Sequence, residues 1–145
     1  MQKVIIPNQT LVEEISRLVN DGTQVTFVPK GSSMLPFIRG ERDSVVLIKD
    51  DNIRPLDIVL AMVGSSYVIH RVLTIDNDRL TLMGDGNLCG TEHCGRNDIL
   101  AKVVKIIKDS RQIDCTSRSH RRQALIWQKL LPVRRYLLGI YRRII

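Results

Sequence analysis

The sequence predicts a mainly β domain that is strongly curved or closed into a barrel, with a short helix before it and an amphipathic helical tail after it. Short runs of alternating or β-branched apolar residues, separated by turn residues, occupy residues 24–107. Apolar residues recur at helical spacing near the two ends of the chain. The length of 145 residues and the hydrophobic content of 43% are those of one domain with a buried core. We therefore expect a single coiled, barrel-like β domain.

Residues 1–23 predict one packing helix. Thr10 and Glu13 have the spacing of a capping box. Apolar residues follow at helical spacing, namely Leu11, Ile15, Leu18 and Val19. We expect the helix to end at Asn20-Asp21-Gly22, because glycine readily takes the left-handed backbone conformation that closes a helix. The segment is too short for a helix-turn-helix DNA-binding domain.

Residues 24–116 form the predicted β domain. Strands are expected at residues 24–28, 44–48, 57–63, 67–75, 79–83 and 99–107. A short turn at residues 64–66 joins two of these strands into a hairpin. The stretch from Gly84 to Asn97 is rich in Gly, Cys and Asn, and it predicts an irregular loop.

Residues 117–145, here called the tail, differ from the rest of the chain in charge. Residues 1–116 contain 14 Lys/Arg and 15 Asp/Glu, whereas the tail contains 8 Lys/Arg and no acid. One apolar stripe has a 4-3-4-3-4 helical spacing, and it consists of Ile126, Leu130, Val133, Leu137, Ile140 and Ile144. Pro132 predicts a kink in this helix or the start of a second one.

The tail has two interpretations that the sequence leaves open. A basic amphipathic helix fits the surface of an anionic membrane, which it contacts without crossing the bilayer. Alternatively, the apolar stripe packs on the β domain or on a second copy, and the arginines are solvated. Nucleic acid is disfavoured as a partner, because the cations alternate with a long apolar stripe.

Three short patterns carry candidate chemistry. Residues 31–36, GSSMLP, would hold Ser33 in a bend beside backbone N–H groups, as a nucleophile with an oxyanion hole requires. His70 lies in the strand at 67–75, on the face of Val68 and Val72, and becomes a candidate general base if Ser33 lies beside it. The carboxylate of Asp85, in the turn GDGN, would then orient the histidine ring. Taken singly, each pattern is equally typical of a turn or a core histidine.

Together these patterns resemble the signal peptidase I and LexA-like serine peptidases. The matching segments are 31–36 (GSSMLP), 38–46 (IRGERDSVV), 55–59 (PLDIV), 67–72 (YVIHRV), 83–87 (MGDGN) and 99–104 (ILAKVV). The resemblance covers roughly residues 24 to 107. It implies a coiled, barrel-like set of β-sheets with Ser33 as the nucleophile.

The resemblance also implies the identity of the base. Bacterial signal peptidases and LexA-like proteins have a lysine where this chain has His70, whereas the endoplasmic-reticulum type has a histidine followed by Arg-Val. His70-Arg71-Val72 matches that branch. In that branch the supporting acid can follow the Gly-Asp turn by several residues, so Asp85 and Glu92 compete for the role, and we favour Asp85.

The leading hypothesis is therefore a serine endopeptidase that hydrolyses a peptide bond in a protein or leader-peptide substrate. Ser33 and His70 form a dyad, or a triad with Asp85 (Glu92 being the alternative). Self-cleavage is disfavoured, because the Ala-Gly or Cys-Gly bond usual in LexA-like proteins is absent before Ser33. The alternative hypothesis is a non-catalytic β binding module that its basic tail holds at a membrane surface or at a partner.

Three cysteines bear on the cellular setting. Their odd number and an N-terminus without a signal-peptide pattern favour a reducing, cytoplasmic location, extending to the inner face of the membrane if the tail binds there. The family usually has a membrane anchor before its serine, and we expect none here. The spacing of Cys89, His93 and Cys94 fits no zinc pattern. We therefore expect neither a metal nor a cofactor.

Overall fold

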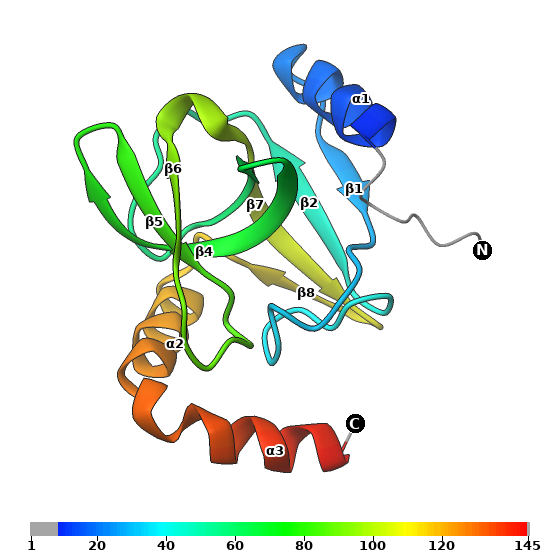
Figure 1. Cartoon of the computed structure of the whole chain (residues 1–145). Coiled ribbons are helices and arrows are strands. Elements are labelled where there is room, and N and C mark those ends of the chain that lie inside the picture. The colour runs from blue at the N-terminus through cyan, green and yellow to red at the C-terminus, as the bar shows by residue number, and fades with distance from the viewer. Residues whose placement is uncertain (1–8, 145) are drawn as a thin grey trace.

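A computed structural model describes residues 9–144, which form one curled, antiparallel, eight-stranded sheet with helices at both ends of the chain (Figure 1). The strands are β1 (Val25–Phe27), β2 (Ser44–Ile48), β3 (Ile58–Val63), β4 (Ser66–Asp76), β5 (Arg79–Met83), β6 (Glu92–Gly95), β7 (Ile99–Lys108) and β8 (Arg111–Asp114). Their order in the sheet is β1-β2-β7-β3-β4-β5-β6, and β8 pairs with β7. The predicted mainly β, barrel-like fold class is confirmed.

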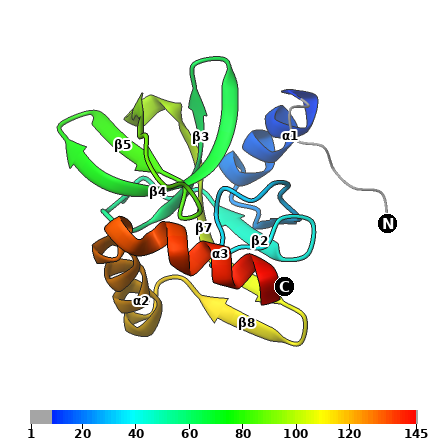
Figure 2. The ribbon, with the colours of Figure 1, turned by 60° about the horizontal axis from the view of Figure 1, so that its bottom comes forward.

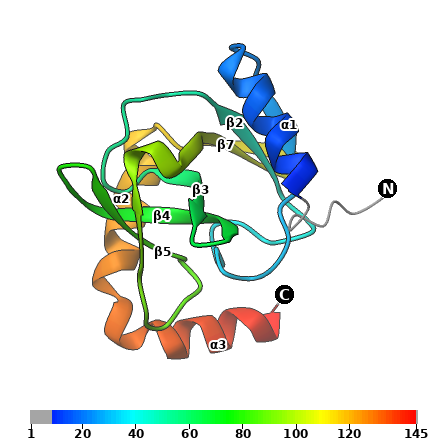
Figure 3. The same cartoon turned by 45° about the horizontal axis from the view of Figure 1, so that its top comes forward.

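The helices lie at opposite ends of the molecule. They are α1 (Gln9–Asn20), α2 (Arg118–Lys129) and α3 (Arg134–Ile144), and two short 3₁₀ helices are η1 (Arg96–Asp98) and η2 (Leu131–Val133). Figures 1 and 3 show α1 at one end of the molecule and α3 along the other. Pro132 lies in η2, so the tail consists of two helices rather than one kinked helix. Across residues 9–144, every helix is too short or too polar to cross a bilayer.

Three local predictions differ from the structure. The first helix begins at Gln9, so Thr10 lies inside its first turn and not at its cap. Strand β6 forms within the expected irregular loop because its residues pair with β5, although their sequence lacks an alternating apolar pattern. Strand β8 is a polar edge strand that the same criterion misses. Gly22 has the expected left-handed conformation, with φ of 86°.

Strand β3 divides the apolar core into two clusters, because successive side chains of a strand point to opposite faces. Ile58 and Leu60 belong to the first cluster, in which Ile15 of α1 also lies. Val59 belongs to the second cluster, together with Val72. Both faces of this central strand are therefore buried, which fits its uninterrupted apolar sequence.

The tail packs on the β domain through a face that the stripe prediction did not identify. Its buried residues are His120, Ala124, Trp127, Arg134 and Leu138. Trp127 and Leu138 form a third apolar cluster with Leu35, which belongs to the predicted serine segment 31–36. Five of the six residues of the predicted apolar stripe are exposed, and Leu130 alone packs against this third cluster, so the expectation that the stripe packs on the β domain holds for Leu130 only. Figure 2 shows α3 lying across the segments that precede β2.

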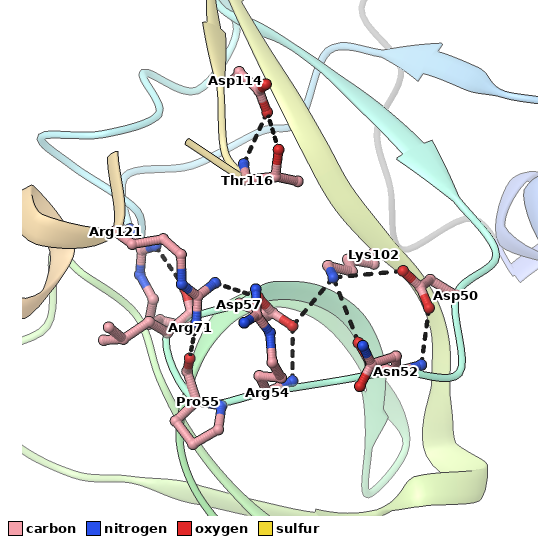
Figure 4. Close-up of polar contacts among 11 residues, drawn as sticks. Asp50, Asn52, Arg54, Pro55, Asp57, Arg71, Lys102, Asp114, Thr116 and Arg121 are labelled. Atoms are coloured by element: carbon pink, nitrogen blue, oxygen red, sulfur yellow. Dashed lines mark hydrogen bonds and ion pairs between the residues drawn. The ribbon is translucent and has the colours of Figure 1, made fainter. Parts of the chain in front are cut away.

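An ionic contact attaches α2 to the sheet region. The buried carboxylate of Asp57 lies between Lys102 of β7 and Arg121 of α2, at 3.4 and 2.7 Å (Figure 4). The same carboxylate accepts a hydrogen bond from the backbone N–H of Arg54. Because Asp57 is only 4% exposed, its negative charge is largely removed from water, and these cations compensate the cost of that desolvation.

The packing predicts unequal effects for two aromatic residues of the tail. Trp127→Ala should lower the free energy of unfolding by about 3–5 kcal/mol, because it removes a buried indole and its hydrogen bond. Tyr136→Ala, at a side chain that is 68% exposed, should change it by less than about 0.5 kcal/mol. Denaturant unfolding of both variants measures the difference. Equal stabilities would show that the tail does not pack as described.

Candidate active site

Ser33 lies on a loop between β1 and β2 whose two ends are held together. The backbone N–H of Glu41 donates to the carbonyl of Pro29, at 2.7 Å. Gly31 and Gly40 touch so closely that a Cβ atom on Gly40 would overlap the backbone of Gly31. The side chain of Met34, next to Ser33, is buried in the first core cluster. The loop is therefore anchored on both sides of the serine.

His70 lies in β4 and is 6% exposed. Its Nδ1 atom hydrogen-bonds to the carboxylate of Glu92 in β6. The other ring nitrogen, Nε2, faces the turn after β5, where it lies 3.1 Å from the position that a Cβ atom on Gly84 would occupy. Glu92 thus fixes the orientation of the ring and leaves Nε2 to accept a proton.

The prediction that Asp85 supports His70 is wrong, because Asp85 binds a different residue. Asp85 is fully buried, and its carboxylate binds the guanidinium of Arg71, with Oδ2 2.6 Å from Nη2 and Oδ1 3.2 Å from Nε. Consecutive residues of β4 point to opposite faces, so the acid on Arg71 cannot also reach His70. Glu92, the predicted alternative, lies on the His70 side, where it pairs across the strands with Leu82.

The turn from Gly84 to Asn87 brings the serine loop and the histidine strand together. The backbone N–H of Gly86 donates to the carbonyl oxygen of Ser33, at 2.8 Å. A Cβ atom on Gly84 would overlap that same carbonyl oxygen. Ser33 and His70 line one cavity of about 140 Å³, whose other walls include Met34 and Leu60. The structure therefore places the two predicted catalytic side chains in one cavity.

Two hydrogen-bonding groups at Ser33 are unused in this structure. Within residues 9–144, the Ser33 hydroxyl makes no hydrogen bond to His70 or to another residue, and the Ser33 backbone N–H donates to no acceptor. The hydroxyl is half-buried. Both groups are therefore available to a molecule that enters the cavity.

Arg71 is the residue of this region whose role sequence reasoning missed. Its Nη1 donates to the carbonyl of Leu56 at 2.9 Å and lies 3.2 Å from Nε2 of His120. Its guanidinium also lies over the ring of Phe37, 4.9 Å from the centroid. The available signal was its place beside His70 in a strand that is buried on both faces, since a buried arginine requires a carboxylate.

The tail also supports these loops from behind. The indole N–H of Trp127 donates to the carbonyl of Asp85 at 2.7 Å, and Arg134 donates to the carbonyl of Asn87 at 3.0 Å. The guanidinium of Arg134 lies 5.0 Å from the centre of the Trp127 ring. Two tail side chains thus hold both ends of the Asp85–Asn87 segment.

His120 is buried against Arg71 in its neutral form. Arg71 can only donate, so Nε2 of His120 accepts and the proton lies on Nδ1, which has no hydrogen-bond partner within residues 9–144. Burial lowers the pKa of His120 to about 4, and the charge of Arg71 adds to this effect. A protonated His120 would place two cations side by side in the interior.

The candidate metal ligands of the β5–β6 region differ in their surroundings. Cys89 is exposed and Cys94 is buried, and burial raises the pKa of the Cys94 thiol. His93 lies near the hydroxyl of Thr81, at 3.2 Å. In the described part of the chain, no three His, Cys, Asp or Glu side chains are arranged to hold a metal ion.

Comparison with known proteins adds no relative. No protein-family model matches the chain, and no curated protein matches it.

The contact at Gly84 predicts a large effect of one added methyl group. Gly84→Ala should lower the free energy of unfolding by about 1–3 kcal/mol, because Cβ would collide with the Ser33 backbone. Gly139→Ala is the matched control, since nothing lies within 4 Å of the added atom and alanine favours helix α3. Chemical denaturation tests the pair. A Gly84→Ala variant as stable as Gly139→Ala would contradict the described contact.

The buried His120 predicts a pH dependence of stability. An unfolded histidine binds a proton below about pH 6.5, whereas folded His120 does so only near pH 4. The unfolded state therefore binds more protons between these values, so stability is full above about pH 6.5 and falls towards pH 4. The loss due to His120 should reach about 3 kcal/mol. Denaturant unfolding at a series of pH values should show this loss of stability in wild type and in His93→Gln but not in His120→Gln. If the stabilities of wild type and His120→Gln change with pH in parallel, the assignment to His120 is contradicted.

Proposed function

We propose that the chain is a serine endopeptidase that uses Ser33 as nucleophile, His70 as general base and acid, and Glu92 as the group that orients His70. The observation that carries the proposal is the shared cavity of Ser33 and His70, together with the Glu92 carboxylate on the far nitrogen of the ring. A nucleophile, a base and an orienting acid in this order are what acyl transfer needs. The resemblance to signal peptidase I and LexA-like peptidases supports the same assignment.

The reaction follows from the free Nε2 atom of His70. The Ser33 oxygen attacks the carbonyl carbon of the scissile bond while Nε2 takes the hydroxyl proton. The carbon–nitrogen bond then breaks, and His70 returns that proton to the leaving amine. Water attacks the resulting ester with His70 again as base, which releases the acid and restores Ser33. Glu92 keeps the Nδ1 proton in place and stabilises the positive charge that the ring carries transiently.

The surroundings of Ser33 supply two further requirements of the reaction. Its unpaired backbone N–H can donate to the oxyanion that forms during attack, and the loss of one such donor costs about 3 kcal/mol of barrier. The apolar walls at Met34, Leu60 and Tyr67 suit an apolar substrate side chain next to the scissile bond.

Cleavage in trans is the form of the reaction that we favour. Of the two glycine-containing bonds upstream that could serve as a self-cleavage site, Lys30-Gly31 lies in the serine loop itself, where Gly31 is held against Gly40. Asp21-Gly22 is the exposed turn after α1. A protein or leader peptide from another molecule needs no rearrangement of the anchored loop.

A non-catalytic binding module is the competing function. The observation in its favour is that the Ser33 hydroxyl and the His70 ring are not hydrogen-bonded to each other. Catalytic hydrogen bonds often form only when substrate is bound, so this geometry is compatible with catalysis. A chemical test of serine reactivity does.

Labelling with a serine-directed fluorophosphonate tests the proposal. Wild type should react, Ser33→Ala should not, and His70→Ala should react about 10²–10⁴-fold more slowly, because the hydroxyl loses its base. Glu92→Gln should also slow labelling. Asp85 is left unchanged in this test, because its replacement would leave the buried charge of Arg71 without a partner and destabilise the fold. Gel fluorescence and mass spectrometry of the labelled peptide give the rates and the site.

Ser32→Ala is the matched control, since this neighbouring serine is exposed and should label like wild type. Circular dichroism establishes that each variant is folded. A folded wild-type protein that does not label, or labelling that persists in Ser33→Ala, would favour the binding module instead.

A further inference from the structure

Most of the large apolar side chains that residues 9–144 expose lie on the outward sides of the tail helices. Nine are exposed within the described residues, and eight of them belong to α2, η2 and α3: Leu125, Ile126, Leu131, Val133, Tyr136, Leu137, Ile140 and Ile144. We call this surface the outer tail face. Its members point away from the β domain, because the opposite side of the same helices holds Trp127 and Leu138. An apolar surface of this extent is typical of a contact with another phase or molecule.

Cations surround the outer tail face. Of the eight Lys/Arg in the tail, Arg121 and Arg134 are the ones whose side chains hydrogen-bond to the β domain within residues 9–144. The other six are exposed: Arg118, Arg122, Lys129, Arg135, Arg142 and Arg143. None of these six forms an ion pair with a carboxylate of residues 9–144, and the tail contains no acid. The charge is therefore free to attract an external polyanion.

We infer that the outer tail face binds the surface of an anionic lipid bilayer. Apolar side chains on a short helix with arginines beside them have the composition of a segment that lies in the lipid headgroup region. Each cation near such a surface adds to the attraction. Both helices are 11 or 12 residues long, which suits a position in the plane of the bilayer.

The alternative occupants fit the outer tail face less well. In a two-fold dimer through this face, the six cations of each copy would meet without an acid in either tail, and like charges across an interface are repulsive. Single-stranded nucleic acid is bound by stacking on several exposed aromatic rings. The outer tail face offers one such ring, Tyr136, and the single tryptophan of the chain is buried against the β domain.

The inference is independent of the proposed catalysis. The inner side of the same helices holds the Asp85–Asn87 segment through Trp127 and Arg134, so α3 lies between the serine loop and the lipid surface. Binding can be measured with Ser33→Ala, whose loss of labelling would not alter the tail. The two proposals can therefore fail separately.

Co-sedimentation with vesicles tests the inference on the full chain. Vesicles of mixed phosphatidylcholine and phosphatidylglycerol, which have a negative surface potential, should bind the protein, and pure phosphatidylcholine should bind it much less. Binding should weaken as salt rises, because salt screens surface charge. Lys129→Gln/Arg143→Gln should weaken binding about 30-fold, from the loss of two cations near the surface. Leu137→Ser/Ile140→Ser should weaken it about tenfold or more.

Matched variants elsewhere on the surface complete the test. Arg79→Gln/Lys105→Gln removes the same charge from the sheet, and Leu88→Ser removes the one large exposed apolar side chain that the described residues have outside the tail. Both should bind like wild type. Equal losses in these controls, equal binding to neutral vesicles, or no binding to anionic vesicles would overturn the inference. So would a dimer that Leu137→Ser/Ile140→Ser dissociates in the absence of vesicle binding.

Discussion

The buried ion pair between Arg71 and Asp85 is the constraint on which the rest of this structure depends. Both side chains have no exposed surface, so each charge must be compensated by the other and by hydrogen bonds. Arg71 gathers four separate parts of the chain around itself: the turn at Asp85, the carbonyl of Leu56, the ring of Phe37 and the tail at His120. Removing either partner of such a pair typically costs about 3–5 kcal/mol. The loops of the candidate site thus derive their positions from an interaction that takes no part in the proposed reaction.

This constraint explains why two neighbouring residues of one strand need two different carboxylates. His70 and Arg71 point to opposite faces of β4, and each is buried. Asp85 compensates the guanidinium on one face, and Glu92 binds the imidazole on the other. A single acid in the Gly84–Asn87 turn could not serve both. Strand β6, which looks like loop in the sequence, is therefore required, because its pairing with β5 carries Glu92 to the His70 side.

Local patterns in the sequence predicted the features that depend on neighbouring residues, such as strands and turns. Alternation and turn residues located most strands, and the resemblance to serine peptidases implied that Ser33 and His70 are neighbours. They could not decide between Asp85 and Glu92, because that depends on which face of the sheet each acid reaches after folding. The tail shows the same limit: its most regular apolar stripe is exposed, while a face that contains Arg134 and His120 is buried. Apolar periodicity detects an amphipathic helix and predicts that its apolar side is buried. Here the opposite side of the helix is buried, because the buried Arg134 has hydrogen-bond partners there.

The two faces of the tail connect the charge of the chain with its architecture. The β domain is close to neutral, and six of the eight cations of the tail are exposed to solvent. The inner side is bound to the backbone of the turn that touches Ser33. The same two short helices therefore have two sides with different roles. Trp127 and Arg134 on the inner side support the turn at the candidate site, and the outer side carries the unpaired charge of the chain.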